Sequence, residues 1–359
     1  MADSDSRQTG QLDLRKLRMG LTVTIAISVT VGLAVTLLAG GKEVLAAAMQ
    51  LPLGWLLLAL GVSALSWVGQ GLGFAALSSR GVRGEIVRMT SAFLGGDFAA
   101  LVTPFGSGGI PAGVFCLTRE GLSAGESSAI IAMHSLLTGL FFLVVGAGAA
   151  IVMPLKTTGA EVLVWSGVGA IAIVLVFVIW LAARPHAVIG WLERVLARPW
   201  LGRALGADRA GRVSNGINRE ARQFAADLKT LSRESPGQLA LSFFGLFASR
   251  ICLVICLPII MYGLGWRGEL LPLMATAIGA MALAIVSPTP GGSGAVEAAT
   301  VALLATQAPA PMAAAATMLW RGVTYYAEVL AGWLAFTRYL ALKPRPAKTA
   351  ESLDESTGG

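Results

Sequence analysis

Long apolar stretches separated by short polar connections dominate the hydropathy pattern of the chain. About 20 mostly apolar residues are enough to cross the hydrocarbon core of a bilayer as a helix. Six stretches reach that length, at Met19–Leu38, Leu53–Leu77, Ala124–Met153, Ala160–Ala183, Gln238–Leu264 and Pro311–Leu340. No small-residue cleavage site follows the first stretch, so we expect an uncleaved span there rather than a signal peptide. The pattern predicts an all-α polytopic membrane protein with about six transmembrane helices.

The composition agrees with that class. Hydrophobic residues make up 55% of the 359-residue chain and charged residues only 13%, whereas soluble domains carry roughly a quarter charged residues. Residues 343–359 at the C-terminal end are polar and are expected to form a disordered tail.

Two nearly identical hexamers interrupt the remaining apolar segments. TPFGSG spans Thr103–Gly108, and TPGGSG spans Thr289–Gly294. Proline and glycine break helices, so each hexamer separates two short apolar arms. The arms are Ser91–Val102 and Ile110–Leu117 around the first break, and Leu270–Ser287 and Ala295–Ala305 around the second.

The distribution of Lys and Arg predicts the orientation. Four precede the first span, three follow the second, ten lie in residues 184–236 and four lie from Arg338 onward, whereas Lys42, Lys156 and Arg267 are alone in their loops. Because cytoplasmic loops carry the positive excess, we expect both termini and the loop 184–236 in the cytoplasm. The protein itself is expected in the cytoplasmic (inner) membrane. The net charge of +7 is then a topology signal, and no nucleic acid is expected as a partner.

This orientation constrains the broken segments. A single crossing through the first break would place the ten-charge loop outside, so we expect a re-entrant hairpin near residues 91–118. A second hairpin is expected near 270–307, although two full crossings there would give the same parity. The chain then divides into a cytoplasmic tail (1–18), a first repeat (19–153), a second repeat (160–342) and the tail (343–359).

The two repeats have the same order of elements in opposite orientation. The register extends beyond the hexamers, since Ser107 to Thr138 and Ser293 to Thr324 are both 31 positions. Inverted repeats with broken helices at matching positions are typical of alternating-access transporters, and the half-helix N-termini attract anions. The alternative is that the hairpins only fill space between helices. For the loop 184–236, helices lying on the inner leaflet and a solvated linker both remain open.

Few ionisable side chains lie within the apolar segments, and each is costly there. Arg250 lies mid-span, and Arg321 and Glu328 are seven apart on one helix face. Glu297 opens the second half-helix. Asp97 and His134 lie in the first repeat as secondary candidates. One interpretation is an anionic-headgroup site on Arg250 and Arg321, with Glu297 as partner or proton carrier; the other is a buried ion-pair network that only joins helices.

The sequence lacks the motifs of metal sites, nucleotide-binding sites and serine hydrolases. Cys116, Cys252 and Cys256 have neither the number nor the spacing of metal ligands, and no phosphate-binding loop or serine-nucleophile motif is present. We therefore expect no metal, no cofactor and no enzymatic activity.

The stretch SPTPGGSGAVEAATVALL resembles the P-x-P-G-G-x-G-x-x-E signature of the lysylphosphatidylglycerol synthase membrane-domain family, also called flippase-like or UPF0104 proteins. LVTPFGSGGIPAGVFCLTREGLSAGESSA and WRGVTYYAEVLAGW are similar to that family's first signature and closing helix. Where many relatives carry an acidic–arginine pair, Met133 and His134 stand in this chain. The resemblance implies site residues at Pro104, Gly108, Gly109, Pro288, Pro290, Gly291, Gly292, Gly294, Glu297, Arg321 and Tyr325. Thr103 and Gly106 of the first break join them as candidates.

The resemblance implies translocation of a phospholipid or lipid-linked headgroup between leaflets. With no large soluble domain after the last span, aminoacyl transfer is not expected. We expect a membrane lipid with an anionic headgroup as substrate, and a second copy of the chain or a lipid-modifying enzyme as candidate protein partners. The alternatives are a non-transporting membrane subunit that supports a lipid-modifying or glycosyl-transferring enzyme and, third, a membrane enzyme.

Overall fold

The computed structural model describes residues 41–152, 169, 172–173, 176 and 236–342. The predicted span Met19–Leu38 and almost all of Ala160–Ala183 lie outside these residues. So do nearly all of the predicted loop 184–236 and both predicted tails. Within the described ranges every regular element is helical and none is a strand, as the hydropathy pattern predicts.

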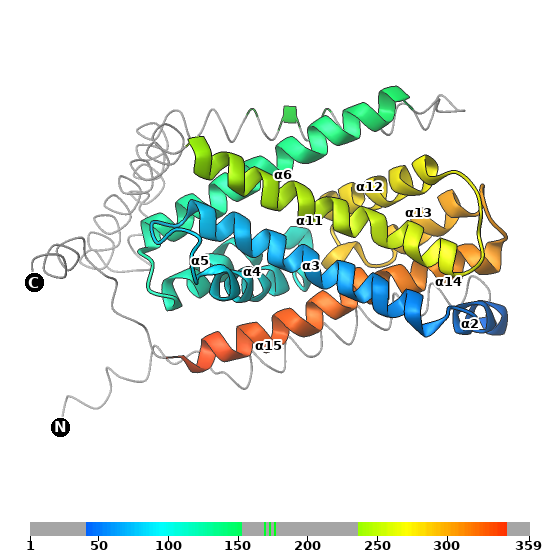
Figure 1. Cartoon of the computed structure of the whole chain (residues 1–359), viewed down its shortest axis with the longest axis horizontal. Helices are drawn as coiled ribbons and strands as arrows, with labels where there is room; N and C mark the ends of the chain where they lie inside the picture. The colour runs from blue at the N-terminus through cyan, green and yellow to red at the C-terminus, as the bar shows by residue number, and fades with distance from the viewer. Residues whose placement is uncertain (1–40, 153–168, 170–171, 174–175, 177–235, 343–359) are drawn as a thin grey trace, which may run out of the picture.

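Three described helices are long and apolar enough to cross a membrane. They are α3 (Leu53–Leu77), α6 (Ala124–Val152) and α11 (Pro236–Gly263). Each begins and ends within two residues of a predicted span. They run along the length of the molecule, and the short helix α2 (Gly41–Met49) lies across one end (Figure 1).

The last predicted span is one helical rod made of three segments. Helix α14 (Ala310–Arg321) continues into the π-helical η3 (Gly322–Tyr326) and then into α15 (Ala327–Ala341), with helical backbone at both junctions. A π-helical turn holds an extra residue, and such turns recur at functional sites. The π segment therefore changes which side chains of this rod face the interior, a detail that hydropathy alone does not predict.

Helices α3 and α11 lie side by side (Figure 1), and glycines bring their backbones into contact. A Cβ on Gly69 would lie 2.7 Å from the carbonyl oxygen of Gly245, and a Cβ on Gly245 would lie 2.6 Å from that of Gly69. Small residues of this kind let membrane helices approach closely. This pair forms the wall against which the broken segments pack.

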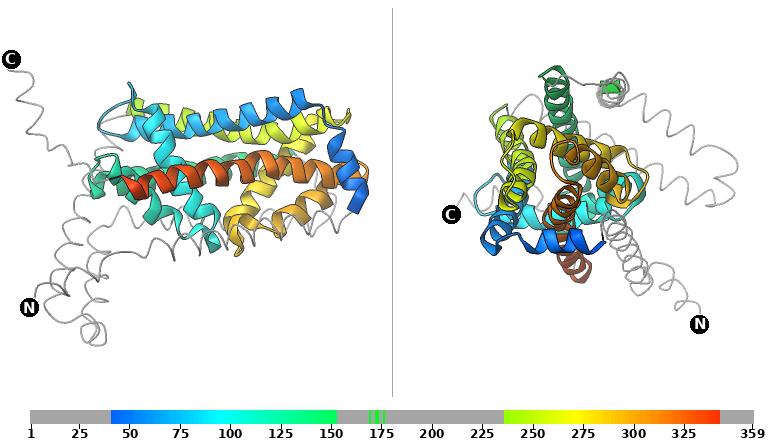
Figure 2. Two further views of the ribbon diagram at one scale, coloured as in Figure 1. Left: turned by 90° about the horizontal axis from the view of Figure 1, so that it is seen from below. Right: turned by 90° about the vertical axis from the view of Figure 1, so that its right-hand side faces the viewer.

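Both hexamers break the helix and form the tips of helical hairpins. Helices α4 (Ile86–Leu101) and α5 (Gly109–Arg119) are joined through η1 (Pro104–Gly106). Helices α12 (Leu270–Val286) and α13 (Ala295–Leu304) are joined through η2 (Pro290–Gly292). The two hairpins come from opposite ends of the long axis (Figure 1), and their tips contact one another at its middle (Figure 2).

The buried core follows this division. One cluster surrounds the first hairpin and includes Phe98, Met133 and Tyr339. A second cluster surrounds the second hairpin and includes Leu257 and Trp320. The tips therefore meet at the boundary between two hydrophobic clusters, where polar groups can be placed without disrupting either.

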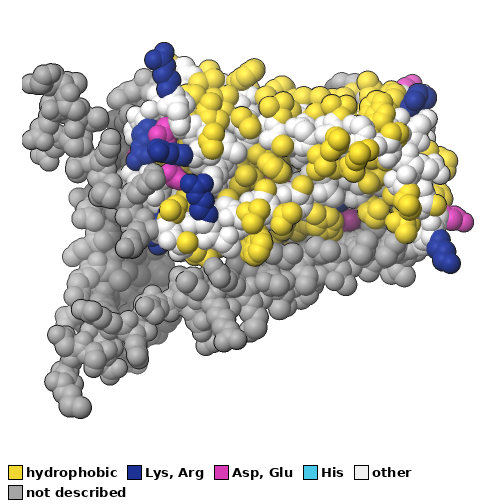
Figure 3. Space-filling model, turned by 60° about the horizontal axis from the view of Figure 1, so that its bottom comes forward, with side chains coloured by type: hydrophobic (Ala, Val, Ile, Leu, Met, Phe, Trp, Pro, Cys, Tyr) yellow, Lys and Arg dark blue, Asp and Glu magenta, His cyan; other side chains and the backbone are white. Residues whose placement is uncertain are grey.

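Charged side chains gather at the two ends of the molecule and leave a broad apolar band between them (Figure 3). Apart from Arg250 and Arg321, the described basic residues lie at helix ends or in connecting loops. Arg80, Arg83, Arg88, Arg119 and Arg338 lie at the end that holds the first hairpin, and Lys42 and Arg267 at the opposite end. An apolar band between charged ends is the surface expected of a protein that crosses a bilayer.

Candidate functional site

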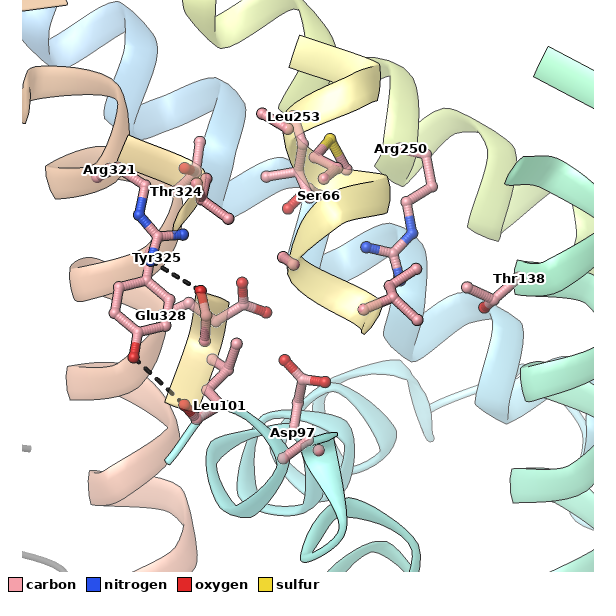
Figure 4. Close-up of a pocket in the computed structure, with 18 of the residues that line it drawn as sticks. Ser66, Asp97, Leu101, Thr138, Arg250, Leu253, Arg321, Thr324, Tyr325 and Glu328 are labelled. Carbon is pink, nitrogen blue, oxygen red and sulfur yellow. Dashed lines mark hydrogen bonds between the residues drawn. The ribbon is translucent and has the colours of Figure 1, made fainter. Parts of the chain in front are cut away.

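A cavity of about 280 Å³ lies where the hairpin tips meet α3, α6, α11 and the α14–α15 rod. Ser66 and Arg250, which line it, are near the middle of α3 and α11. The cavity is therefore about halfway along the helices that are long enough to span a membrane. Its wall carries an unusual number of polar side chains for this depth, several of which are labelled in Figure 4.

The two tips begin with nearly the same backbone and diverge at their ends, where Ser107 and Ser293 have ψ of −26° and 132° and Gly108 and Gly294 have φ of −75° and 89°. Phe105 and Gly291 occupy the same turn position with φ of 54° and 57°. Such left-handed values are unusual for a residue with a side chain, so Phe105 is held in a conformation that Gly291 adopts freely. This part of both tips lines the cavity, through Phe105, Gly106, Thr289 and Gly291.

Side-chain hydrogen bonds stabilise each turn differently. In the first tip, Thr103 Oγ1 accepts a bond from the Gly108 N–H at 2.8 Å and donates to the Ala99 carbonyl at 2.6 Å. In the second, the Gly294 N–H donates to Glu297 Oε2 at 2.7 Å. Glu297 thus caps its own helix, an arrangement that the positive end of the helix dipole also favours.

Glu297 and Arg321 form a buried ion pair. Arg321 Nε donates to Glu297 Oε1 at 2.8 Å, and Arg321 Nη2 donates to the Gly291 carbonyl at 2.9 Å. The two residues are only 1% and 5% exposed. The pair joins the α14–α15 rod to the second tip, which fits the ion-pair interpretation that the sequence left open for these two residues.

Tyr325 connects the same rod to both tips. Its ring lies under the Arg321 guanidinium, 3.9 Å from the ring centroid, and a Cβ on Gly291 would overlap it. Its hydroxyl donates to the Leu101 carbonyl, at the start of the first tip, at 3.2 Å (Figure 4). One aromatic side chain therefore touches each hairpin.

Arg250, Asp97 and Glu328 form a second group of charges in the cavity. Asp97 and Glu328 lie within interaction distance of each other, and both interact electrostatically with Arg250. Arg250 enters from α11, across the cavity from Arg321 (Figure 4). Arg250 makes no ion pair with any residue that the structure describes, and its buried Nε has no hydrogen-bond partner among them. Its guanidinium lies 5.8 Å from the centroid of the Phe142 ring.

The structure brings together seven of the residues proposed from sequence. The cavity is lined by Asp97, Gly106, Arg250, Gly291, Arg321, Tyr325 and Glu328. Nine other candidates lie in or beside the tips and do not line the cavity: Thr103, Pro104, Gly108, Gly109, Pro288, Pro290, Gly292, Gly294 and Glu297.

His134 lies apart from the cavity, edge-on to Phe74 and Phe93 with ring centroids 4.9 and 6.1 Å away. His134 is on α6 and the two phenylalanines are on α3 and α4, so this contact could not be predicted from local sequence.

Several cavity residues were missed by sequence reasoning. Ser66, Gln70, Thr138, Ser249 and Thr324 line the cavity with the charged groups. Ser66 and Gln70 are four residues apart on α3, on one helix face. Polar residues at helical spacing inside an otherwise apolar span were a signal that could have identified them.

A comparison with family models matches residues 23–332 to the lysylphosphatidylglycerol synthase TM region. Searches of curated proteins and of solved structures return no match. The match covers most of the chain, includes both hexamers and ends within α15. The chain therefore belongs to the lysylphosphatidylglycerol synthase TM-region family, whose name connects this multi-pass membrane protein with lipid metabolism.

Proposed function

We propose that this protein is a flippase-like transporter, which moves a phospholipid or lipid-linked anionic headgroup between leaflets by alternating access. The observation that carries the proposal is Arg250, which lines a cavity halfway along the long helices and whose buried Nε has no hydrogen-bond partner among the described residues. A guanidinium at such depth is costly unless it has a partner. A phosphate group matches its planar set of donors.

The size and surroundings of the cavity fit a headgroup with its acyl chains outside. About 280 Å³ accommodates a polar headgroup and not two long chains. Phe105 and Ile285 line the cavity and are 65% and 49% exposed. They give the cavity an apolar margin along which acyl chains would remain in the bilayer.

The proposal includes re-entrant hairpins in an inverted repeat. Helix α13 has ten residues and is about 15 Å long at about 1.5 Å per residue, half of a roughly 30 Å hydrocarbon core. Tips that meet midway from opposite ends would alternately close the cavity to each side. The basic end, which holds the first hairpin, would face the cytoplasm together with both termini, in the cell inner membrane.

Transport can be measured in proteoliposomes that contain phosphatidylglycerol with a fluorophore on one acyl chain. An impermeant reductant bleaches the outer leaflet, and further loss of signal reports lipid movement. We expect Arg250→Gln to slow movement roughly tenfold or more, equivalent to about 1.4 kcal/mol. Arg267→Gln is the matched control, since Arg267 is exposed at one end and bonds the Tyr262 and Trp266 carbonyls.

Equal rates for Arg250→Gln and the parent would refute the site. A parent protein that binds lipid without moving it would instead favour a non-transporting subunit of a lipid-modifying enzyme. Thin-layer chromatography of the same vesicles would reveal any chemical change in the lipid, and we expect none.

Orientation has its own test in intact cells, with a chain lacking native cysteines. We expect Arg83→Cys to react only with membrane-permeant thiol reagents and Arg267→Cys to react with impermeant ones, because these positions lie at opposite ends of the molecule. Labelling of the Arg83→Cys position from outside would rule out the proposed orientation.

A further inference from the structure

The charges in the cavity do not balance. Arg321 and Glu297 neutralise each other in a closed pair. The remaining charged groups that line the cavity are Asp97, Glu328 and Arg250, two acids against one base. Fully ionised, they would leave one net negative charge inside the membrane protein, which is costly in a low-dielectric interior.

The two carboxyl groups lie close together, which indicates how the excess negative charge is removed. Asp97 on α4 and Glu328 on α15 lie within interaction distance and point into the same cavity (Figure 4). Neighbouring carboxylates in such a site share a proton, because two like charges at short range cannot both ionise without large cost. With one shared proton the group Asp97–Glu328–Arg250 is neutral while the cavity is empty.

An anionic headgroup changes this balance. A phosphate that binds Arg250 adds one negative charge beside the carboxyl pair, which then favours a second proton by the same electrostatics. We propose that the Asp97–Glu328 pair takes up one proton for each anionic headgroup bound at Arg250, so that lipid and proton cross together as an electroneutral unit. This inference rests on the proposed function and adds its coupling ion.

The other titratable groups around the cavity are less suited to the role. The two oxygens of Glu297 on α13 are already used, one accepting from Arg321 Nε and the other from the Gly294 N–H. The Tyr325 hydroxyl donates a hydrogen bond to the Leu101 carbonyl. His134 on α6 lies outside the cavity lining. The carboxyl pair is therefore the group that can change its charge without breaking a tip contact.

Several buried polar atoms at and near the cavity lack a hydrogen-bond partner among the described residues. Around the cavity, Gln70 Oε1, Thr138 Oγ1 and Ser249 Oγ have no hydrogen-bond partner among the described residues. Nearer the basic end, the same holds for His134 Nδ1 and Ser242 Oγ. A Cβ on Gly73 would lie 3.9 Å from the first of these atoms and 3.5 Å from the second. Buried polar groups of this kind are commonly satisfied by internal water, so the surroundings of the carboxyl pair suit a group that exchanges protons.

The first measurement uses lipid-free protein in detergent at neutral pH. Infrared difference spectra between the parent and Glu328→Gln or Asp97→Asn should show the C=O stretch of a protonated carboxylic acid in the parent and its loss in either variant. Glu269→Gln, an exposed acid before α12, is the matched control and should retain the band. A parent without the band refutes the shared proton, whether or not the protein transports lipid.

The second measurement adds short-chain phosphatidylglycerol to protein in weakly buffered detergent solution and records the pH. We expect uptake of one proton per lipid bound by the parent and by Glu269→Gln, and no uptake by the double variant Asp97→Asn/Glu328→Gln, which has no carboxyl left in the pair to protonate. Lipid binding without proton uptake, or binding that requires Na⁺ in place of a proton, would overturn the coupling and leave the transport proposal standing. Size-exclusion profiles of the isosteric variants establish that they are folded. Should the double variant misfold, the infrared band of the parent decides the result, since it should grow when lipid is added and the second proton binds.

Discussion

The two hairpin tips begin with the same backbone conformation and differ in what holds them. Shifting the sequence by the 186 positions that separate Thr103 from Thr289 places Pro111 at the position of Glu297 and Ser135 at that of Arg321. Among the described residues, therefore, the second tip has a buried ion pair, at 2.8 Å, and the first has none. The first is attached to the α14–α15 rod through the Tyr325 hydroxyl on the Leu101 carbonyl. The comparison teaches that the shared start of the hexamer sets the first half of each turn and that residues outside the turn set how each tip is held.

If the protein works by the proposed alternating access, this asymmetry affects how easily each tip separates from the rod. A tip anchored by a charged pair moves with the rod, whereas a tip anchored by one neutral hydrogen bond separates from it at lower cost. We infer that the turn of the first tip is the less firmly held of the two, although the helices behind it pack closely on α15, where Phe98 contacts Phe336 and the Tyr339 hydroxyl bonds Arg88 and Glu120.

The largest effect is expected from removing the charged anchor. Arg321→Ala leaves Glu297 buried without its partner, and we expect a loss of about 3–5 kcal/mol in stability. Thermal unfolding in detergent measures it, with Arg267→Ala as the exposed control. The double variant Arg321→Ala/Glu297→Ala should recover part of the loss, since no charge is stranded. A single variant as stable as the parent would show that the pair anchors nothing.

A matched pair of glycines tests the space around each tip. Gly106 and Gly292 occupy the same turn position, with φ of 65° and 70°. A Cβ on Gly106 meets nothing closer than 3.8 Å, whereas on Gly292 it would lie 2.5 Å from Val296 Cγ2 and 3.0 Å from Ala284 Cα. Gly106→Ala should therefore cost only the left-handed strain of about 1–2 kcal/mol, and Gly292→Ala should cost more. Equal costs in chemical unfolding would mean that the two tips are packed alike.

The smallest effect is expected at Tyr325. Tyr325→Phe keeps the ring under Arg321 and removes the hydroxyl that reaches Leu101, a loss of about 0.5–1.5 kcal/mol. Hydrogen exchange should accelerate in the first tip, around Val102–Gly108, and stay unchanged in the second, around Thr289–Gly294. Faster exchange in both tips would show that the ring, and not the hydroxyl, controls them.

Sequence alone determined the class of the protein and the places where its helices break. Spans such as Leu53–Leu77 follow from apolar length, and the breaks follow from proline and glycine, because both are local properties of the backbone and its solvent. The pairing of Glu297 with Arg321 was foreseen as one of two interpretations, since buried charges need partners.

Only the tertiary structure decided how the candidate site is divided. Asp97 and Glu328 are 231 positions apart in the sequence, and no spacing rule places two carboxyl groups from different helices against each other. The same holds for Arg250, which enters the cavity from a third helix, α11, and interacts electrostatically with both carboxyl groups. Tip-to-tip contact brings these groups together, and it arises from the packing of both hairpins against α3 and α11, which is a property of the whole fold.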